Sequence, residues 1–374
     1  MGIDLHNAKP LYHQIIDDIR YKVKSGDLKI GDPIGSQNEL ARQYNVSLIT
    51  VKKALSELIK EGILYSRVGK GTYVASKNPK SQNVTTKTLG LVLQDMKSPF
   101  FSLIAQEAEN IAFKRGYSIL FSHASGQVDK EESQISQFRQ IGVSGLIIAS
   151  MTHVYYADEM IRKLHNEEFP YVMVSYIHDP DIYFVGTNHE YGGHIATCHL
   201  IEGGYKRIGY INGEEGNLVG ELRYQGYVRA LSEQGREVND KYVYRLPRGG
   251  EWYDFTSGYE MGKKICKLSD RPDAVFLYND LAALGFQRAI LEDGLRIPED
   301  IAIVGFDDID RASYARVPLT TVKQPIKEIA DHAIENILKR KNKESAPIKT
   351  ILNPELIVRS SSFKNISKNI VVES

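Results

Sequence analysis

The chain of 374 residues lacks features that define several large classes of protein. Its two cysteines, Cys198 and Cys266, have neither a CxxC spacing nor a nearby histidine pair, which argues against a disulfide framework and a metal site. No apolar run approaches the roughly 20 residues that span a bilayer, and the N-terminus lacks a signal sequence. We therefore expect a soluble cytoplasmic protein with no membrane partner.

The signatures of catalysis are also missing. The chain has no HExxH zinc motif and no phosphate-binding loop, and no nucleophile accompanies the paired acids Asp307 and Asp308. A transport-type binding protein would be secreted, and the sequence gives no sign of secretion. We expect neither an enzyme nor a protein that needs a metal or another cofactor.

Charge of one sign is not in excess, because 47 basic residues match 47 acidic residues. The distribution is uneven, however: residues 1–80 hold 13 lysines and arginines against 8 aspartates and glutamates. A basic head on an acidic body is typical of a protein in which the head alone meets nucleic-acid phosphates. The chain is also too long for one small domain, so we expect two or three.

Residues 31–74 show the order of signals of a winged helix-turn-helix. Ser36 starts a short amphipathic helix that ends at Tyr44, and after a tight turn Ser47 opens a second helix that continues to Lys60. Two short runs, 63–65 and 71–74, then flank a basic, glycine-bearing tip as the strands of a hairpin. Such a module places one helix in a major groove of DNA. The apolar face of the second helix is formed by Val51, Ala54, Leu55, Leu58 and Ile59.

The exposed residues of this module are the candidate DNA contacts. Asparagine can bind adenine, lysine can bind guanine or phosphate, and apolar side chains can contact thymine methyl groups. An ordinary solvated helix face is the alternative, but the position on the second helix of a winged motif favours DNA. The candidates are Asn38, Ser47, Leu48, Thr50, Lys52 and Lys53, with Gly69 and Lys70 at the wing tip.

A linker and a larger α/β body follow the head. Residues 76–87 contain one valine among twelve residues, which is typical of a linker. Short apolar runs then alternate with amphipathic stretches, which predicts doubly wound parallel sheets with helices on both faces. One large sheet would fit, but an irregular stretch favours two lobes with a ligand at the carboxyl ends of the strands. Crossovers between the lobes are expected near Gly186, Leu319 and Ser345.

Polar and aromatic residues lie where strands are predicted to end. Asn279 and Asp280 follow one apolar run, and Asp307 and Asp308 follow another. Paired acids fit a metal site, a catalytic dyad or caps of the following helices, and capping is the better interpretation for Asp280 and Asp308. Aromatic side chains on cleft loops stack on ligand rings or simply pack at helix starts. The aromatic candidates are Phe100, Phe101 and the single tryptophan, Trp252.

The head resembles the GntR family of bacterial regulators. Members of that family often carry arginines at the positions of Asn38 and Leu48, and a basic residue at the position of Lys52. The resemblance implies DNA binding through the second helix and the wing. The matching residues are Gly31, Ser36–Ala41, Val46–Ser47, Thr50–Leu55, Leu58, Glu61–Gly62 and Gly69–Val74.

Residues 88–360 resemble the sugar-responsive domain of the LacI/GalR family, itself similar to periplasmic sugar-binding proteins. The resemblance implies that Arg223 clamps ligand oxygens and that Asn279 and Asp307 bind sugar hydroxyls. The matching residues are Ser98–Phe101, Arg115–Tyr117, Val143–Ile148, Arg223–Tyr227, Asn279–Asp280, Ala283–Gly285, Gly294–Asp300, Val304–Asp308 and Pro318–Thr321.

A GntR-type head on a LacI-type body is similar to the arabinose repressors of the AraR type. The combination implies a homodimeric repressor that binds double-stranded operator DNA. A monosaccharide, with arabinose the lead candidate, would release the repressor from this DNA. The alternative is a corepressor-type regulator that binds a non-sugar metabolite such as a purine. The expected domains are a winged helix-turn-helix at 1–75, a linker at 76–87, a two-lobed effector-binding and dimerisation domain at 88–360 and a tail at 361–374. The dimer seam is expected at 98–115 and 323–342.

Overall fold

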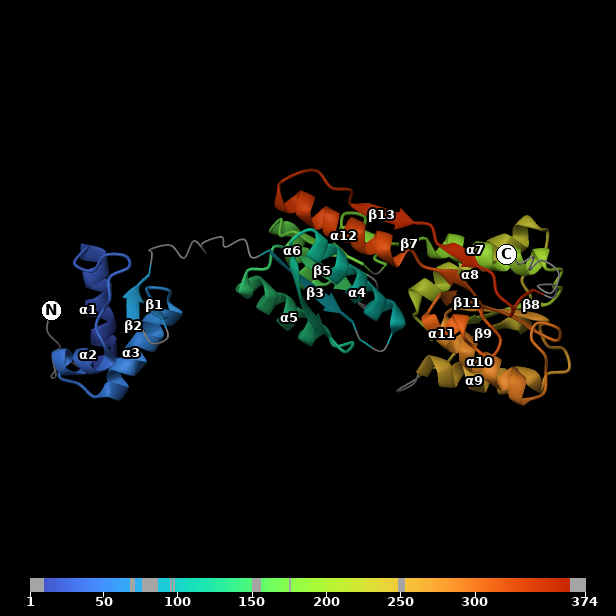
Figure 1. The fold of residues 1–374 in the computed structure, drawn as a ribbon, viewed down its shortest axis with the longest axis horizontal. Helices are drawn as coiled ribbons and strands as arrows, with labels where there is room; N and C mark the ends of the chain where they lie inside the picture. Colours follow the sequence, from blue (N-terminus) through green and yellow to red (C-terminus); the bar gives the residue numbers. More distant parts are fainter. Residues whose placement is uncertain are drawn as a thin grey trace, which may run out of the picture. The chain divides into compact units, whose positions relative to one another are not determined.

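The computed structural model describes residues 10–67, 71–75, 87–94, 96, 98–149, 156–174, 176–247 and 253–363. The chain divides into two compact units, Met1–Thr85 and Thr86–Ser374, and the elements of both are drawn in Figure 1. We call the first unit the head and the second unit the body.

The head is a winged helix-turn-helix, as predicted. Ser36 caps α2 through a capping box with Glu39, and Ser47 caps α3 by accepting a hydrogen bond from the Thr50 amide. Asn45, in the turn between the two helices, has a φ of 52°, which asparagine tolerates better than most residues. The elements are α1 (Leu11–Ser25), α2 (Gln37–Tyr44), α3 (Leu48–Lys60) and the antiparallel strands β1 (Leu64–Arg67) and β2 (Gly71–Val74).

Helix α1, which the sequence analysis did not predict, completes the core of the head. Its isoleucines pack with Val51, Ala54, Leu55 and Leu58 of α3. Ile59, which was predicted to share this face, is instead 37% exposed near the end of the helix. Beside this core, the Tyr44 hydroxyl donates to Asp18 Oδ2 at 2.7 Å, and Lys22 Nζ lies 2.7 Å from the same oxygen. Burial acts to raise the pKa of Asp18, but the hydrogen bonds from Lys22 and Tyr44 outweigh it and lower that pKa. The buried carboxylate therefore ties α1 to the end of α2.

The first lobe of the body is a parallel sheet between two layers of helices. Leu91 and Leu93 pack with α4 (Pro99–Lys114) and α12 (Ile326–Lys341), whereas Val92 packs with α5 (Val128–Ile141) and α6 (Glu159–Asn166) on the other face. Burial of both faces explains the continuous apolar runs of the sequence. In spatial order the strands are β13 (Lys349–Leu352), β7 (Phe184–Thr187), β6 (Tyr171–Met173), β5 (Leu146–Ala149), β3 (Thr88–Leu93) and β4 (Ser118–His123).

The second lobe has the same layered plan. Helix α7 (His189–Glu202) packs on α8 (Leu218–Glu233), and α9 (Tyr253–Cys266) packs on α10 (Asp280–Glu292). Figure 1 shows the two pairs on opposite sides of the strands. The short helices are η1 (Asp240–Tyr242) and α11 (Asp310–Ser313). In spatial order the strands are β14 (Glu355–Ile357), antiparallel to its neighbour, then β12 (Thr320–Lys323), β11 (Ala302–Asp307), β10 (Ala274–Leu277), β8 (Ile208–Asn212) and β9 (Val243–Arg245).

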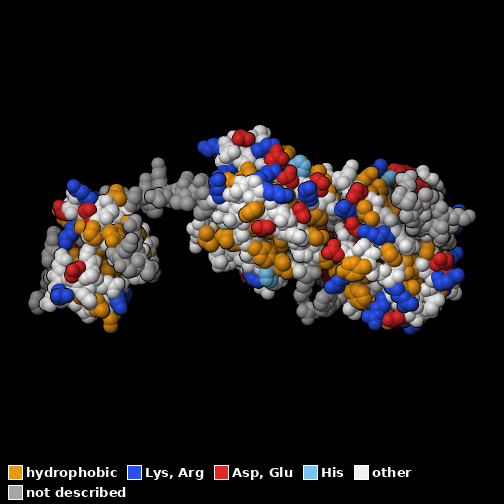
Figure 2. Space-filling model, viewed as in Figure 1, with side chains coloured by type: hydrophobic (Ala, Val, Ile, Leu, Met, Phe, Trp, Pro, Cys, Tyr) orange, Lys and Arg blue, Asp and Glu red, His pale blue; other side chains and the backbone are white. Residues whose placement is uncertain are grey.

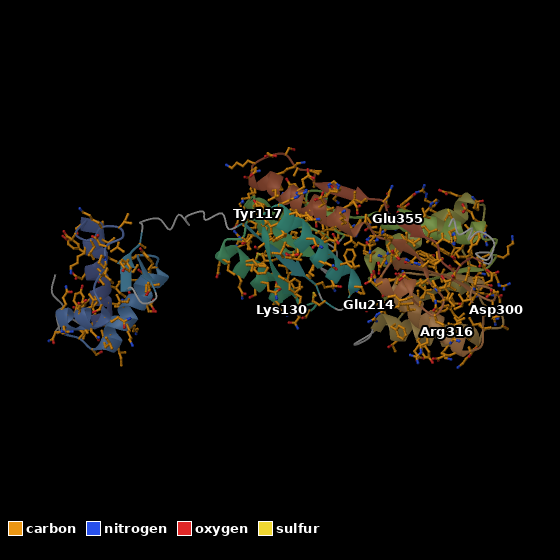
Figure 3. All side chains as sticks on the ribbon, viewed as in Figure 1. Tyr117, Lys130, Glu214, Asp300, Arg316 and Glu355 are labelled. Atoms are coloured by element: carbon orange, nitrogen blue, oxygen red, sulfur yellow. The ribbon has the colours of Figure 1, made fainter. Side chains whose placement is uncertain are left out.

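The chain crosses between the lobes after β7, after β12 and after β13. The crossing segments bind one another: Asn188 Nδ2 donates to Asn353 Oδ1 at 2.9 Å, and Thr187 Oγ1 donates to Gln324 Oε1 at 2.6 Å. The last crossing ends at Glu355, which Figure 3 labels. Movement of one lobe against the other must pass through these hydrogen-bonded segments.

Two of the three predicted crossovers are wrong. The crossover near Gly186 lies within two residues of the observed one, but Leu319 is buried in the core of the second lobe. Ser345 lies between α12 and β13, inside the first lobe. The reason is that β12 is short and largely polar, so the sequence analysis missed the strand that returns the chain to the second-lobe sheet before the crossing.

The packed part of the body extends past residue 360. Ser361 and Ser362, assigned to the tail by the sequence analysis, are buried. Ser361 Oγ donates to the Ile303 carbonyl oxygen at 2.6 Å, and Ser362 Oγ donates to Thr320 Oγ1 at 2.7 Å. The end of the described chain therefore fastens β11 and β12 together.

Candidate functional site

The first turn of α3 presents the candidate DNA contacts of the head. Ser47 and Thr50 bind each other, since the Thr50 amide donates to Ser47 Oγ at 3.2 Å and the two hydroxyl oxygens lie 2.8 Å apart. Leu48 is 38% exposed and its neighbour Ile49 is 78% exposed. Lys52, one turn further along, also faces solvent. The exposed surface at the start of α3 is therefore apolar, and the exposed Lys52 lies one turn further along the helix.

The other candidates in the head occupy different positions. Lys53 Nζ lies 3.9 Å from the centre of the Tyr12 ring on α1, a cation–π contact. Asn38 is exposed in the first turn of α2. The wing-tip candidates Gly69 and Lys70 lie outside the described residues. Figure 2 shows hydrophobic and basic side chains next to one another on the surface of the head.

In the body, a close crossing of α7 and α8 positions Arg223. A Cβ atom on Gly193 would lie 2.0 Å from the Arg223 carbonyl oxygen, and one on Gly226 would lie 2.0 Å from the Glu190 carbonyl oxygen. Only glycine fits at these two positions, so the helix backbones meet directly. The Arg223 side chain is 4% exposed and reaches the carboxyl ends of β10 and β11.

The Arg223 guanidinium is the centre of this site. It donates to the Tyr278 carbonyl oxygen, and Nη2 lies 3.4 Å from His189 Nδ1 and 3.6 Å from Asp307 Oδ1. Its carbon lies 3.6 Å from the centre of the Phe306 ring. Burial, and then the charge of Arg223, holds the pKa of His189 well below its usual value, so the imidazole is neutral. The Nε–H of Arg223 has no hydrogen-bond partner among the described residues.

Asp307 ends β11 in a strained conformation. Its φ of 118° lies in a region that side-chain-bearing residues rarely adopt. Oδ1 accepts a hydrogen bond from Gln324 Nε2 at 2.7 Å, so the carboxylate is joined to a segment that crosses between the lobes. Burial raises the pKa of Asp307 to about 6, although Arg223 and Gln324 act to lower it. Near neutral pH the Asp307 carboxyl group is therefore mostly ionised and can only accept hydrogen bonds.

Asn279 is the N-cap of α10. Its Oδ1 accepts from the Ala282 amide at 2.9 Å, and its Nδ2 donates to Asp254 Oδ2 at 2.8 Å. Asp254 also accepts a hydrogen bond from the Tyr278 hydroxyl. The predicted candidate is thus held by its neighbours, with one amide proton and one lone pair left over.

The capping interpretation of Asp280 and Asp308 is wrong. Asp280 is fully buried and accepts from the Thr321 hydroxyl at 2.6 Å and from the Ile309 amide at 3.0 Å. Burial raises its pKa well above the usual value. Asp308 forms an ion pair with Arg359 at 2.7 Å. Both acids stabilise the loop after β11. Their carboxyl groups bind partners on other elements and therefore do not cap the helix that follows each of them.

The aromatic candidates divide between core and surface. Phe101 is 7% exposed in the core of the first lobe, and Phe100 packs on the same core while half-buried. Their ring centres lie 5.3 Å apart at 69°. The pair is helix-start packing, with only part of Phe100 left at the surface. Trp252 lies outside the described residues.

The site offers a cation from Arg223, a carboxylate from Asp307 and an amide from Asn279. Across the residues that the structure describes, no group of three or more His, Cys, Asp or Glu side chains is placed to hold a metal ion. Cys198 and Cys266 are free thiols. No helix in the described part of the chain is long and apolar enough to cross a membrane. The chemistry of the Arg223, Asn279 and Asp307 side chains is suited to hydrogen bonding with a polar molecule.

Comparison with known proteins decides the family. Residues 11–74 match the model of bacterial regulatory proteins of the gntR family, and residues 197–362 match that of a periplasmic binding protein-like domain. Over 362 residues the chain is 33% identical to the arabinose metabolism transcriptional repressor of Geobacillus stearothermophilus, covering 94% of this chain and 98% of the relative. The chain belongs to this family of transcriptional repressors.

Other members of the wider group match the body. The HTH-type transcriptional repressor PurR of Aliivibrio salmonicida (strain LFI1238) is 31% identical over 283 residues, 75% of this chain and 83% of that protein. A solved periplasmic binding protein/LacI transcriptional regulator from Alkaliphilus metalliredigens QYMF, complexed with D-xylulofuranose, has 27% identity and a TM-score of 0.63, covering 74% of this chain and 99% of that one. This repressor is accordingly a DNA-binding regulator of the LacI/GntR type and not an enzyme.

Three residues of this repressor's body site were missed by sequence reasoning. His189 and Gln324 come from segments that cross between the lobes, and Asp254 holds Asn279 from 25 positions away. His189 is the last residue of the irregular stretch 186–189 that suggested two lobes, which was the one available signal. Gln324 and Asp254 meet their partners only through the tertiary fold.

Proposed function

We propose that this repressor is a homodimer that leaves its operator when an uncharged monosaccharide, arabinose foremost, binds to its body. The observation that carries the proposal is the buried pair of Arg223 and Asp307, with a free Nε–H and a carboxylate beside the Phe306 ring. Donors and acceptors placed in this way suit the hydroxyls of a sugar, and the fully buried Phe306 ring supports the guanidinium of Arg223 from beneath. Arg223, Asn279 and Asp307 hold hydroxyls, and Phe100 and Trp252 are proposed to cover the ring.

The charges of the site favour a neutral effector. Asp254 and Asp307 flank Asn279 and Arg223, and the fully buried Asp280 lies close enough to interact with Asp307. One buried guanidinium faces these carboxyl groups, and His189 adds no charge. A phosphorylated sugar would bring further negative charge into this low-dielectric setting, which is unfavourable.

The head supplies the DNA contacts and the linker at 76–87 joins it to the body. One small head holds DNA weakly, so we place two heads on a pseudo-palindrome with half-sites about one or two turns (~10 bp each) apart. Twelve flexible residues span about 20 Å root-mean-square. Coupling to the body therefore requires the linker to become ordered on DNA or on the body.

The dimer seam is proposed at 98–115 and 323–342. Phe113, in the last turn of α4, is 75% exposed, which supports an apolar contact on that side. The exposed face of α12 is charged, so α4 supplies the apolar part of the seam. Phe113→Glu is expected to shift full-length protein toward monomer in sedimentation velocity, with Phe121→Glu on the neighbouring strand as a comparison. The charged residues of α12 include Lys327, Glu328, Asp331 and Glu335.

Thermal shift and operator release test the function together. Full-length protein is mixed with arabinose, other pentoses and hexoses, a pentose phosphate or a purine base, and release from a selected operator duplex is followed by fluorescence anisotropy. We expect arabinose to raise the unfolding temperature of the body and to release the duplex, and the pentose phosphate to do neither. A shift by the purine alone, with tighter DNA binding, would instead identify a corepressor-type regulator.

A further inference from the structure

Ile49 is an isoleucine that the fold of the head does not use. It is the second residue of α3 and 78% exposed, while Val51 and Leu58 on the opposite face of the helix are fully buried. A β-branched side chain is a mediocre helix former, and its apolar surface costs free energy in water. Ile49 therefore needs an explanation outside the core of the head.

The neighbours of Ile49 define the surface to which it belongs. Residues three and seven positions on, Lys52 and Ser56, share its face of the helix and are exposed. Leu48 extends the apolar surface sideways. The first turn of α3 contains no acidic residue, so a negatively charged partner can approach the helix start without repulsion. We call the surface formed by Leu48, Ile49, Lys52 and Ser56 the stripe. Its tip, at Leu48 and Ile49, is apolar, and its flank carries the positive charge of Lys52.

Polar side chains near this tip are already engaged. The hydroxyls of Ser47 and Thr50 bind each other, and Lys53 rests on the Tyr12 ring. The groups left to meet a partner at the helix start are the hydrocarbon side chains of Leu48 and Ile49. A partner that fits must combine negative charge with a small apolar group.

Resting on the proposed operator binding, we propose that Ile49, with Leu48 beside it, contacts the 5-methyl group of a thymine in each operator half-site. The major groove of DNA presents this methyl group on thymine and hydrogen there on cytosine. A hydrocarbon side chain neither donates nor accepts hydrogen bonds, so it discriminates by the methyl group alone. Lys52 on the flank of the stripe meets the adjacent phosphates.

The test removes one methyl group at a time. A consensus duplex is selected from random DNA with the full-length protein, and each thymine is replaced singly by deoxyuridine, which changes only the 5-methyl group. The affinity of each duplex is measured by anisotropy for the wild type, for Ile49→Ala and for Ile30→Ala. Ile30 is the matched control because it is an isoleucine of the head that is 64% exposed outside α3.

We expect one thymine per half-site at which deoxyuridine weakens wild-type binding about fourfold, and about 16-fold when both half-sites are changed. Ile49→Ala loses this sensitivity, and Ile30→Ala keeps it. Sensitivity that is absent at every thymine, or equal in wild type and Ile49→Ala, overturns the inference and leaves operator binding intact. If the selection yields no consensus sequence, the proposed operator binding is contradicted. The inference about Ile49 is then contradicted too, because it rests on operator binding.

Discussion

The two functional regions of this repressor are built on opposite principles. In the head, the groups proposed to face DNA are mostly exposed at the start of one helix, and their contacts are with residues of the head surface. In the body, Arg223, Asn279 and Asp307 are buried or nearly so, and each is bound by residues distant in sequence. A change in the head face should therefore alter binding alone, whereas a change in the body site should alter both binding and stability.

The largest effect is expected from Arg223→Met. The substitution leaves Asp307 buried without its cation, which costs about 3 kcal/mol of body stability, the lower end for a broken buried pair because Asp307 can take up a proton. It also removes the donor that we propose binds the effector, so affinity should fall at least about 100-fold. Calorimetric unfolding of the full chain and effector titration measure both.

Arg229→Met is the matched control for this change. Arg229 lies on the same helix, but it is half-exposed and pairs with Glu233 and Glu190 at the surface. Such pairs contribute little, so stability and effector affinity should change only slightly. Equal losses in the two variants would contradict the contrast between buried and exposed groups.

Effector affinity should depend on pH through Asp307. Its pKa is raised by burial to about 6, above the unfolded value of about 3.9, so its carboxylate is lost as pH falls through about 6. Effector binding should be about tenfold weaker at pH 5 than at pH 7.5, because the protonated group is the poorer acceptor. The same proton uptake stabilises the folded body as pH falls toward 4.

Asp307→Asn should remove the pH dependence of effector binding without unfolding the body. The amide keeps the size of the side chain and one acceptor oxygen, so the Gln324 contact has a substitute partner. Isothermal titration between pH 5 and 8 compares the two proteins. A wild-type affinity that is flat across this range would argue that Asp307 does not touch the effector.

In the head, Tyr44→Phe should cost about 1–2 kcal/mol of local stability. It removes the donor to the buried Asp18 carboxylate and leaves that oxygen less satisfied. Because the pKa of Asp18 is lowered in the fold, its contribution is present above about pH 4 and is lost as pH falls through the folded pKa. Hydrogen exchange of head peptides in the full chain measures the change. Tyr21→Phe, at an exposed position, should have no effect.

The smallest change is expected from the lysines of α3. Lys52→Ala should lower the slope of log Kd against log salt by roughly one unit if Lys52 meets a phosphate. Lys53→Ala should lower it less, since Lys53 rests on Tyr12. Both variants should unfold at the wild-type temperature. A larger decrease in the salt slope for Lys53→Ala than for Lys52→Ala would contradict the proposal that Lys52 is the lysine that contacts phosphate.

The same contrast explains how much could be predicted from the sequence. Helices α2 and α3 of the head were predicted correctly because their signals are local. Ser36 and Ser47 each cap the helix that follows them, and the apolar face of α3 is visible in the spacing of its own residues. The apolar strands of the body were predicted, among them the buried β3 and β5 and the half-exposed β4, but the short strands β9, β12, β13 and β14 were not. Short strands of mixed polarity gain their identity from the neighbours with which they pair.

The candidate site was only partly predictable for a related reason. Asn279 and Asp307 lie at strand ends that the sequence pattern indicates, whereas Arg223, in the second turn of α8, was singled out by the family resemblance. Their partners Gln324, His189 and Asp254 come from other elements, and no spacing rule joins them. The capping interpretation of Asp280 failed because Asn279, one residue earlier, satisfies the same helix start.

The central claim is that effector binding in the body and DNA binding in the head are coupled, so that the effector releases the operator. The most direct test is to titrate arabinose into the full-length protein with and without saturating operator duplex. Coupling is reciprocal, so operator should weaken arabinose binding by the same factor by which arabinose weakens operator binding. Equal arabinose affinities in the two titrations would contradict the claim, and tighter binding on DNA would reverse the direction of the switch.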